Sequence, residues 1–66
     1  MSRWSLVDEY VERYGSDRAA VAAFAADLMR GDPAVFKVGY TRENAVIATA
    51  EAFDLERSYV DGAVPR

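Results

Sequence analysis

Hydrophobic residues recur along the first part of the chain with the spacing of an amphipathic helix. Trp4, Val7, Val11 and Tyr14 are separated by three, four and three positions, and charged residues fall between them. This spacing places the apolar side chains on one face of a helix. Gly15 follows, and glycine is the usual residue where a helix ends in the left-handed conformation. The pattern therefore predicts a first helix that ends near residue 14.

Residues 16–31 predict a second helix, because a serine that can cap a helix and a glycine that can end one lie on either side of an apolar repeat. The expected core stripe consists of Val21, Phe24, Ala25 and Leu28. The opposite side carries alanines where charged residues would normally stand: Ala19, Ala22, Ala23 and Ala26. A helix that is apolar on both sides is usually covered on both sides. We expect this second face to be covered by the last helix or by a second copy of the chain.

A short apolar segment, residues 34–38, follows Asp32 and Pro33 and ends at Gly39. Aspartate caps helices and proline fits the first helical position, so we expect a short helical turn here. The alternative is a strand over residues 35–38 that pairs with the C-terminal tail, since valine and phenylalanine are dense in this segment.

The last long helix is expected to begin after Thr41, a capping residue, and to run to about Arg57, with Asp54 as the candidate for a break. Residues 58–66 contain Asp61, Gly62 and Pro65, which predict a turn-rich C-terminal tail. The fold class that follows is all-α. We expect residues 1–66 to form a single small domain, a three-helix bundle with an additional short helical turn.

The composition excludes several kinds of catalytic and metal site but does not identify a function. The 66 residues include no histidine and no cysteine, so the most common general bases and soft metal ligands are absent from the sequence. We expect no enzyme activity, no metal and no cofactor. Asp27 and Glu51 lie on alanine-rich helices, where we interpret them as surface charges rather than as an acid–base pair. The net charge of −3 argues against non-specific binding to nucleic acid, which requires a basic surface.

The compartment and the source organism of the protein can be inferred only from general features of its sequence. No apolar run approaches the roughly 20 residues of a membrane span, and the start shows no cleavable signal, so we expect a cytoplasmic protein. Abundant alanine and the use of arginine in place of lysine are typical of a high-GC genome, bacterial or phage. This composition fits a small accessory protein of a bacterium or a phage.

Two surfaces are not buried by pattern alone. The first is an apolar group around Gly39, formed by Val35, Phe36 and Tyr40. The second is an acidic ridge on the last helix with one aliphatic residue, formed by Glu43, Ile47, Glu51 and Asp54. Aromatic and large apolar residues supply most of the binding energy of protein interfaces. We therefore expect a non-enzymatic, regulatory interaction module that binds a larger protein or a second copy of itself, and not a nucleic acid, a membrane or a small-molecule substrate.

A helix-turn-helix DNA-binding regulator is the alternative. It would use the turn at residues 39–41 and place Arg42 and Asn44 at the start of a recognition helix, since arginine reads guanine and asparagine reads adenine. Glu43 and Glu51 would share that helix and would be repelled by phosphates.

A local likeness arises at the same place. Residues 38–43, followed by residues 54–57, resemble the loop and the start of the third helix of ubiquitin-associated domains. Those domains are compact three-helix modules that bind a partner through a Met-Gly-Phe or Met-Gly-Tyr loop. In this chain Val38 stands where the methionine is usual, and Gly62 and Pro65 would break the third helix. The resemblance covers about half of the chain and implies that the loop at Gly39 is a contact surface.

Overall fold

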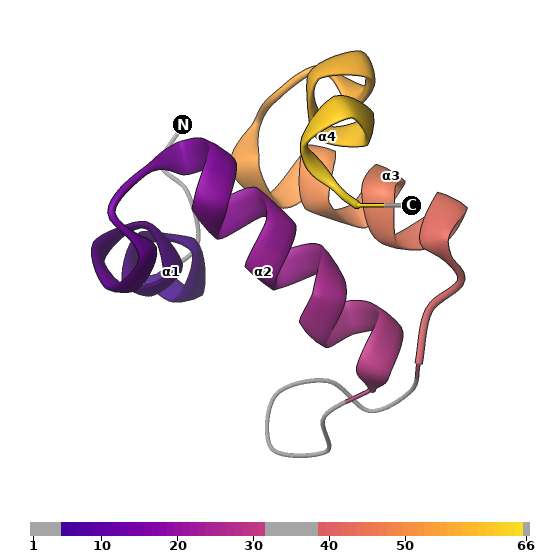
Figure 1. Ribbon diagram of the computed structural model, residues 1–66, viewed down its shortest axis with the longest axis horizontal. Coiled ribbons are helices and arrows are strands. Elements are labelled where there is room, and N and C mark those ends of the chain that lie inside the picture. The colour runs from indigo at the N-terminus through magenta and orange to yellow at the C-terminus, as the bar shows by residue number, and fades with distance from the viewer. Residues whose placement is uncertain (1–4, 32–38, 66) are drawn as a thin grey trace.

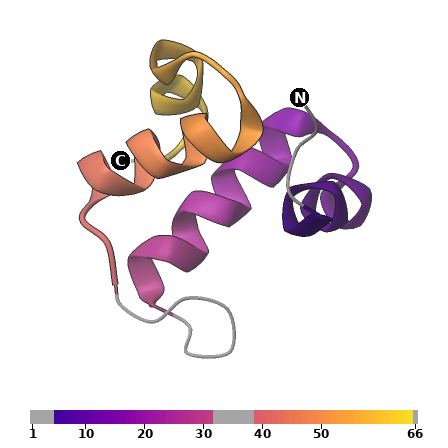
Figure 2. The same ribbon diagram turned by 180° about the vertical axis from the view of Figure 1, so that it is seen from behind.

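The computed structural model describes residues 5–31 and 39–65, and these ranges form four helices and no strand. The helices are α1 (Ser5–Tyr14), α2 (Asp17–Arg30), α3 (Arg42–Phe53) and α4 (Arg57–Ala63). Helix α2 lies at the centre, with α1 against one side and α3 and α4 against the other (Figure 1 and Figure 2). The all-α prediction is confirmed. The expected short turn and the alternative strand fall on residues 34–38, outside the described residues.

The ends of α2 are those that its flanking residues predict. The Ser16 hydroxyl accepts a hydrogen bond from the Ala19 N–H, which satisfies one of the unpaired amides of the first turn. At the other end, Gly31 has a φ of 72° and donates its N–H to the Asp27 carbonyl. Glycine adopts this left-handed conformation without steric cost, so α2 ends there.

Helix α3 ends earlier than the sequence predicts. Thr41 caps its start, as expected, by accepting from the Asn44 N–H. Its end is at Phe53, because Asp54 adopts a left-handed φ of 57°. The Leu55 N–H then reaches back to the Ala50 carbonyl at 2.9 Å, which is the hydrogen bond of a Schellman cap. The predicted break at Asp54 is confirmed, whereas the predicted continuation of the same helix to Arg57 is wrong.

The segment expected to be a turn-rich tail, residues 58–66, is mostly helical. Helix α4 covers Arg57–Ala63 and packs against α2 and α3. Val60 and Val64 are both buried, and their spacing of four residues puts them on one helical face. Gly62 lies inside the helix instead of ending it. Burial of these two valines therefore outweighs the weak helix propensity of the segment.

The core is built around aromatic rings from three helices. The Tyr10 ring of α1 meets the Phe24 ring of α2 edge-on at 5.2 Å, and Phe24 meets Phe53 of α3 in the same way at 5.4 Å. Such edge-to-face pairs add to the stabilisation that comes from burial. All four members of the stripe predicted for α2 are buried, and Ala20 joins them. One buried polar group is not satisfied: the Thr49 hydroxyl has no hydrogen-bond partner among the described residues.

The alanine face of α2 is less covered than the sequence predicts. Ala19, Ala22 and Ala23 are half-buried, and Ala26 is exposed. The described helices therefore cover this face only in part, so full coverage by the last helix is not found, and coverage by a second copy stays a prediction. None of the helices in the described residues is long and apolar enough to cross a membrane.

Candidate functional site

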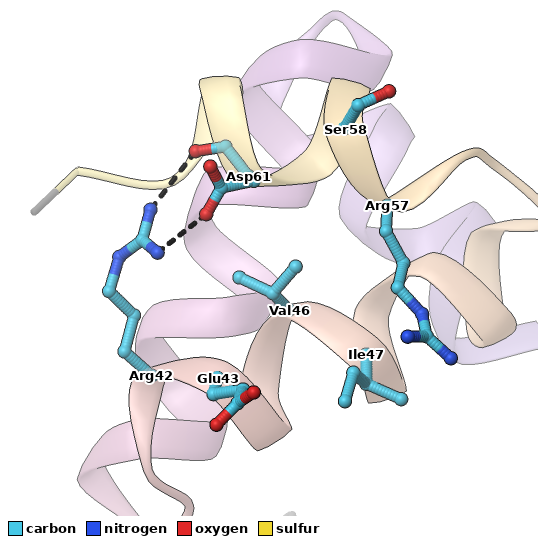
Figure 3. A pocket seen from close by; sticks show the side chains of 7 residues that line it. All are labelled: Arg42, Glu43, Val46, Ile47, Arg57, Ser58 and Asp61. Atoms are coloured by element: carbon cyan, nitrogen blue, oxygen red, sulfur yellow. Dashed lines mark hydrogen bonds and ion pairs between the residues drawn. The ribbon is translucent and has the colours of Figure 1, made fainter.

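A groove of about 480 Å³ lies between α3 and α4 (Figure 3). Helix α3 contributes Arg42, Glu43, Val46 and Ile47, and α4 contributes Arg57, Ser58 and Asp61. The volume falls within the range of sites that accept side chains or small ligands. The space lies between these two helices and is open to solvent on its outer side.

The floor of the groove is apolar and its centre is Ile47. Val46 is buried and continues into the core, whereas Ile47 is half-buried and faces the groove. In Figure 3 the Ile47 side chain lies between those of Glu43 and Arg57. An aliphatic side chain between two charges of opposite sign is therefore the central feature of the site.

Arg42 closes one end of the groove by holding the C-terminus of α4. One guanidinium nitrogen donates to the Asp61 carboxylate at 2.6 Å, and another donates to the Asp61 backbone carbonyl at 3.0 Å (Figure 3). The second nitrogen also donates to the Val64 carbonyl at 2.8 Å. Arg18 of α2 donates to the Gly62 carbonyl at 3.0 Å. The last carbonyls of a helix have no partner within the helix and carry partial negative charge. Both arginines therefore stabilise the end of α4.

This role of Arg42 bears on the DNA-binding alternative. That interpretation assigns the Arg42 guanidinium to a base edge, but three of its hydrogen bonds go to α4. Glu43 and Glu51 are exposed on the same helix. Acidic side chains beside phosphates oppose binding to DNA.

Glu43 and Arg57 are the charged residues of the groove whose side chains have no partner among the described residues. The ion pairs among the described residues join Asp27 to Arg30 and Arg42 to Asp61. Neither the Glu43 side chain nor the Arg57 side chain makes a hydrogen bond or ion pair to a described residue, and both are exposed. They are consequently free to pair with charges on a binding partner.

The structure brings together only part of the predicted contact surface. Glu43 and Ile47 line the groove, whereas Glu51 is exposed further along α3 and Asp54 ends that helix. Tyr40 is 37% exposed just before α3, and its N–H donates to the Leu28 carbonyl at 2.8 Å. The predicted residues Val35 and Phe36 lie outside the described residues.

Sequence reasoning missed the whole contribution of α4. Arg57, Ser58 and Asp61 were assigned to a helix end and a turn-rich tail, so no groove could be foreseen beside Ile47. The available signal was the spacing of Val60 and Val64, which is that of one helical face.

Asp27 corrects a second expectation. The sequence predicts a surface charge, but the Asp27 side chain is only 18% exposed and accepts hydrogen bonds from the Tyr10 hydroxyl and from Arg30. Burial, together with the hydrogen bond to the Asp27 carboxylate, raises the pKa of Tyr10 well above its ordinary value. This pair joins α1 to α2 and lies outside the groove, so its role is structural. Glu51, the other carboxylate of that interpretation, is exposed.

Comparisons with known proteins add no relative. No protein-family model matches the chain, and neither a curated protein nor a solved structure matches it significantly. The resemblance to ubiquitin-associated domains thus stays confined to the two short segments that carry it. Among the described residues, no cluster of three or more acidic side chains could hold a metal ion.

Proposed function

We propose that this chain is a non-enzymatic protein-binding module whose contact site is the groove between α3 and α4. The observation that carries the proposal is the half-buried Ile47 between two unpaired charges of opposite sign, Glu43 and Arg57. Protein interfaces concentrate their binding energy on a few apolar or aromatic side chains, while a charged rim sets association rate and selectivity. The groove has both parts.

The chemistry available in the groove supports binding rather than catalysis. Histidine and cysteine are absent from the sequence. Arg42 and Asp61 neutralise each other, which leaves one carboxylate, one guanidinium and the Ser58 hydroxyl. No base lies in hydrogen-bond contact with that hydroxyl among the described residues, and an unactivated serine is a weak nucleophile.

Tyr40 and Glu51 extend the proposed surface beyond the groove. Tyr40 lies just before α3 with a part-exposed ring, and Glu51 lies one turn beyond Ile47 on the same helix. A larger partner that fills the groove would reach both residues. We assign Tyr40 a secondary anchoring role and Glu51 a role in steering the approach of the partner.

A selection experiment tests this proposal. A displayed library of random peptides is selected on the immobilised chain, and the affinity of each enriched peptide is measured by calorimetry. Ile47→Ala should weaken binding by roughly tenfold or more, as expected for truncation of a central apolar residue, and Tyr40→Ala should weaken it less. Val11→Ala is the matched control, because Val11 is also a half-buried aliphatic residue but lies on α1, across α2 from the groove.

The control variant should leave the affinity unchanged, and circular dichroism should show that all three variants stay helical. Peptides whose affinity falls as much in Val11→Ala as in Ile47→Ala would place the contact site elsewhere and contradict the proposal.

A further inference from the structure

We infer that the partner segment is an amphipathic helix that presents an aliphatic side chain between an acid and a base. The aliphatic side chain contacts Ile47, the acid pairs with Arg57, and the base pairs with Glu43. The inference rests on the proposed function and adds to it the chemistry of the partner. Three features of the groove lead to it.

The first feature is the position of Arg57. It is the first residue of α4, where the helix dipole places partial positive charge, so a cation there disfavours the helix that carries it. The side chain is exposed and has no carboxylate partner among the described residues. The stability of the chain therefore gives no reason for an arginine at this position, whereas an ion pair with a carboxylate of the partner gives one.

The second feature is the balance of charge around the apolar floor. Arg42 and Asp61 are paired with each other, so the field along the groove comes mainly from Glu43 on one side of Ile47 and Arg57 on the other. A segment with only acidic residues would be attracted by Arg57 and repelled by Glu43. A segment with only basic residues would be attracted by Glu43 and repelled by Arg57. Only a segment with both signs, in the matching order, gains at both positions.

The third feature is the spacing of the groove residues along α3. Glu43 and Ile47 are four residues apart, which is one helical turn, or roughly 6 Å between their Cβ atoms. A partner helix that lies along α3 repeats the same spacing, so its base and its aliphatic residue reach both positions together. The groove is open along one edge, and a free small molecule would leave much of its surface in water, which favours a macromolecular partner.

The test uses a displayed library of helical peptides randomised on one face. Peptides selected on the unmodified chain should carry an acid and a base on either side of an aliphatic residue. The same library selected on Arg57→Glu should return bases on both sides, and peptides from the first selection should bind this variant at least about tenfold more weakly. Arg57→Glu should fold, since the residue is exposed and glutamate is favourable in a first helical turn.

Glu43→Gln gives an independent measurement. It should weaken binding of the selected peptides and reduce the dependence of their affinity on salt concentration, because one ion pair with the partner is lost. Glu9→Gln, which makes the same change at an exposed position on α1, is the matched control and should alter neither.

The outcomes separate this inference from the proposed function. Peptides that depend on Ile47 but show no preference for flanking charges would overturn the inference and leave the proposed function standing. A selection that returns no peptide dependent on Ile47 would overturn both. If light scattering shows a dimer of the chain that Arg57→Glu dissociates, the occupant of the groove is a second copy and the inference of a separate partner helix is wrong.

Discussion

Replacing Arg42 with alanine should destabilise the chain far more than replacing any other exposed or half-exposed arginine. Arg42 is the side chain through which the start of α3 holds the end of α4. Alanine removes the guanidinium and leaves the last carbonyls of α4 to water. Because α4 has only seven residues, it depends on contacts made from outside it.

The magnitude follows from the contacts. The hydrogen bonds to the Asp61 and Val64 carbonyls, at 3.0 and 2.8 Å, each contribute about 1 kcal/mol net. The ion pair with the Asp61 carboxylate adds about 0.5 kcal/mol, since that carboxylate is 42% exposed and solvent screens it. The 3.4 Å contact to the Pro65 carbonyl is too long to add much. The expected loss is therefore about 2–3 kcal/mol, a large part of the ~3–5 kcal/mol that so small a core supplies.

Chemical denaturation followed by circular dichroism measures this loss, and amide hydrogen exchange at Val60 and Val64 shows whether α4 opens first. Asp61→Asn removes the ion pair with Arg42 but keeps both carbonyl contacts, so it should cost less than Arg42→Ala. Arg57→Ala is the matched control, because Arg57 has no partner among the described residues and should change stability by no more than about 0.5 kcal/mol. If Arg42→Ala costs no more than Arg57→Ala, the guanidinium does not hold α4 and the reasoning is refuted.

Four further substitutions test the packing. Gly39→Ala should lower the free energy of unfolding by about 1–3 kcal/mol, because the new Cβ would lie 3.0 Å from a backbone carbonyl oxygen of α2. Gly62→Ala should raise it by about 0.5–1 kcal/mol, because no heavy atom lies near the new Cβ and alanine favours the helix. Equal effects of the two would contradict the close approach at Gly39. Thr49→Val should raise the free energy of unfolding by about 1 kcal/mol by removing the unsatisfied buried hydroxyl, and a decrease would mean that this hydroxyl is bonded after all. The raised pKa of Tyr10 means that the folded chain holds this proton more tightly than the unfolded chain, so its contribution to stability is complete below the ordinary tyrosine pKa of about 10 and is lost as pH rises above it. Tyr10→Phe should lower the free energy of unfolding by about 1 kcal/mol at neutral pH, because it removes the hydrogen bond to Asp27. The variant should also lose less stability than the unmodified chain at alkaline pH. An unchanged alkaline loss would mean that the other tyrosines cause it.

The sequence predicts the ends of α2 and the start of α3 because those signals are local. Ser16, Gly31 and Thr41 each act on a neighbouring backbone group, so the residue type alone indicates the structure. The end of α3 is different in kind. Asp54 is a weak stop signal, and the chain turns there because Leu55 packs against the core and its N–H completes the cap.

The groove could not be derived in the same way, because it depends on contacts between segments distant in sequence. Pattern alone indicates that Glu43 and Ile47 lie on a helix face that the core does not bury. In the structure Glu43 is exposed and Ile47 is half-buried in the groove lining, and their role in binding stays a prediction. Their neighbours Arg57 and Ser58 come from a helix that is stable only when Val60 is buried and Arg42 holds its end. Propensity within those residues argues against a helix, so pattern alone predicted a tail.

The central position of Phe24 has a consequence for how the chain unfolds. Its ring contacts Tyr10 of α1 on one side and Phe53 of α3 on the other, and α1 packs mainly on α2. Phe24 thus joins the aromatic packing of α1 to that of α3. A shorter residue at position 24 would weaken both ring contacts at once, so α1 would separate from α2 at a lower temperature than α2, α3 and α4 separate from one another.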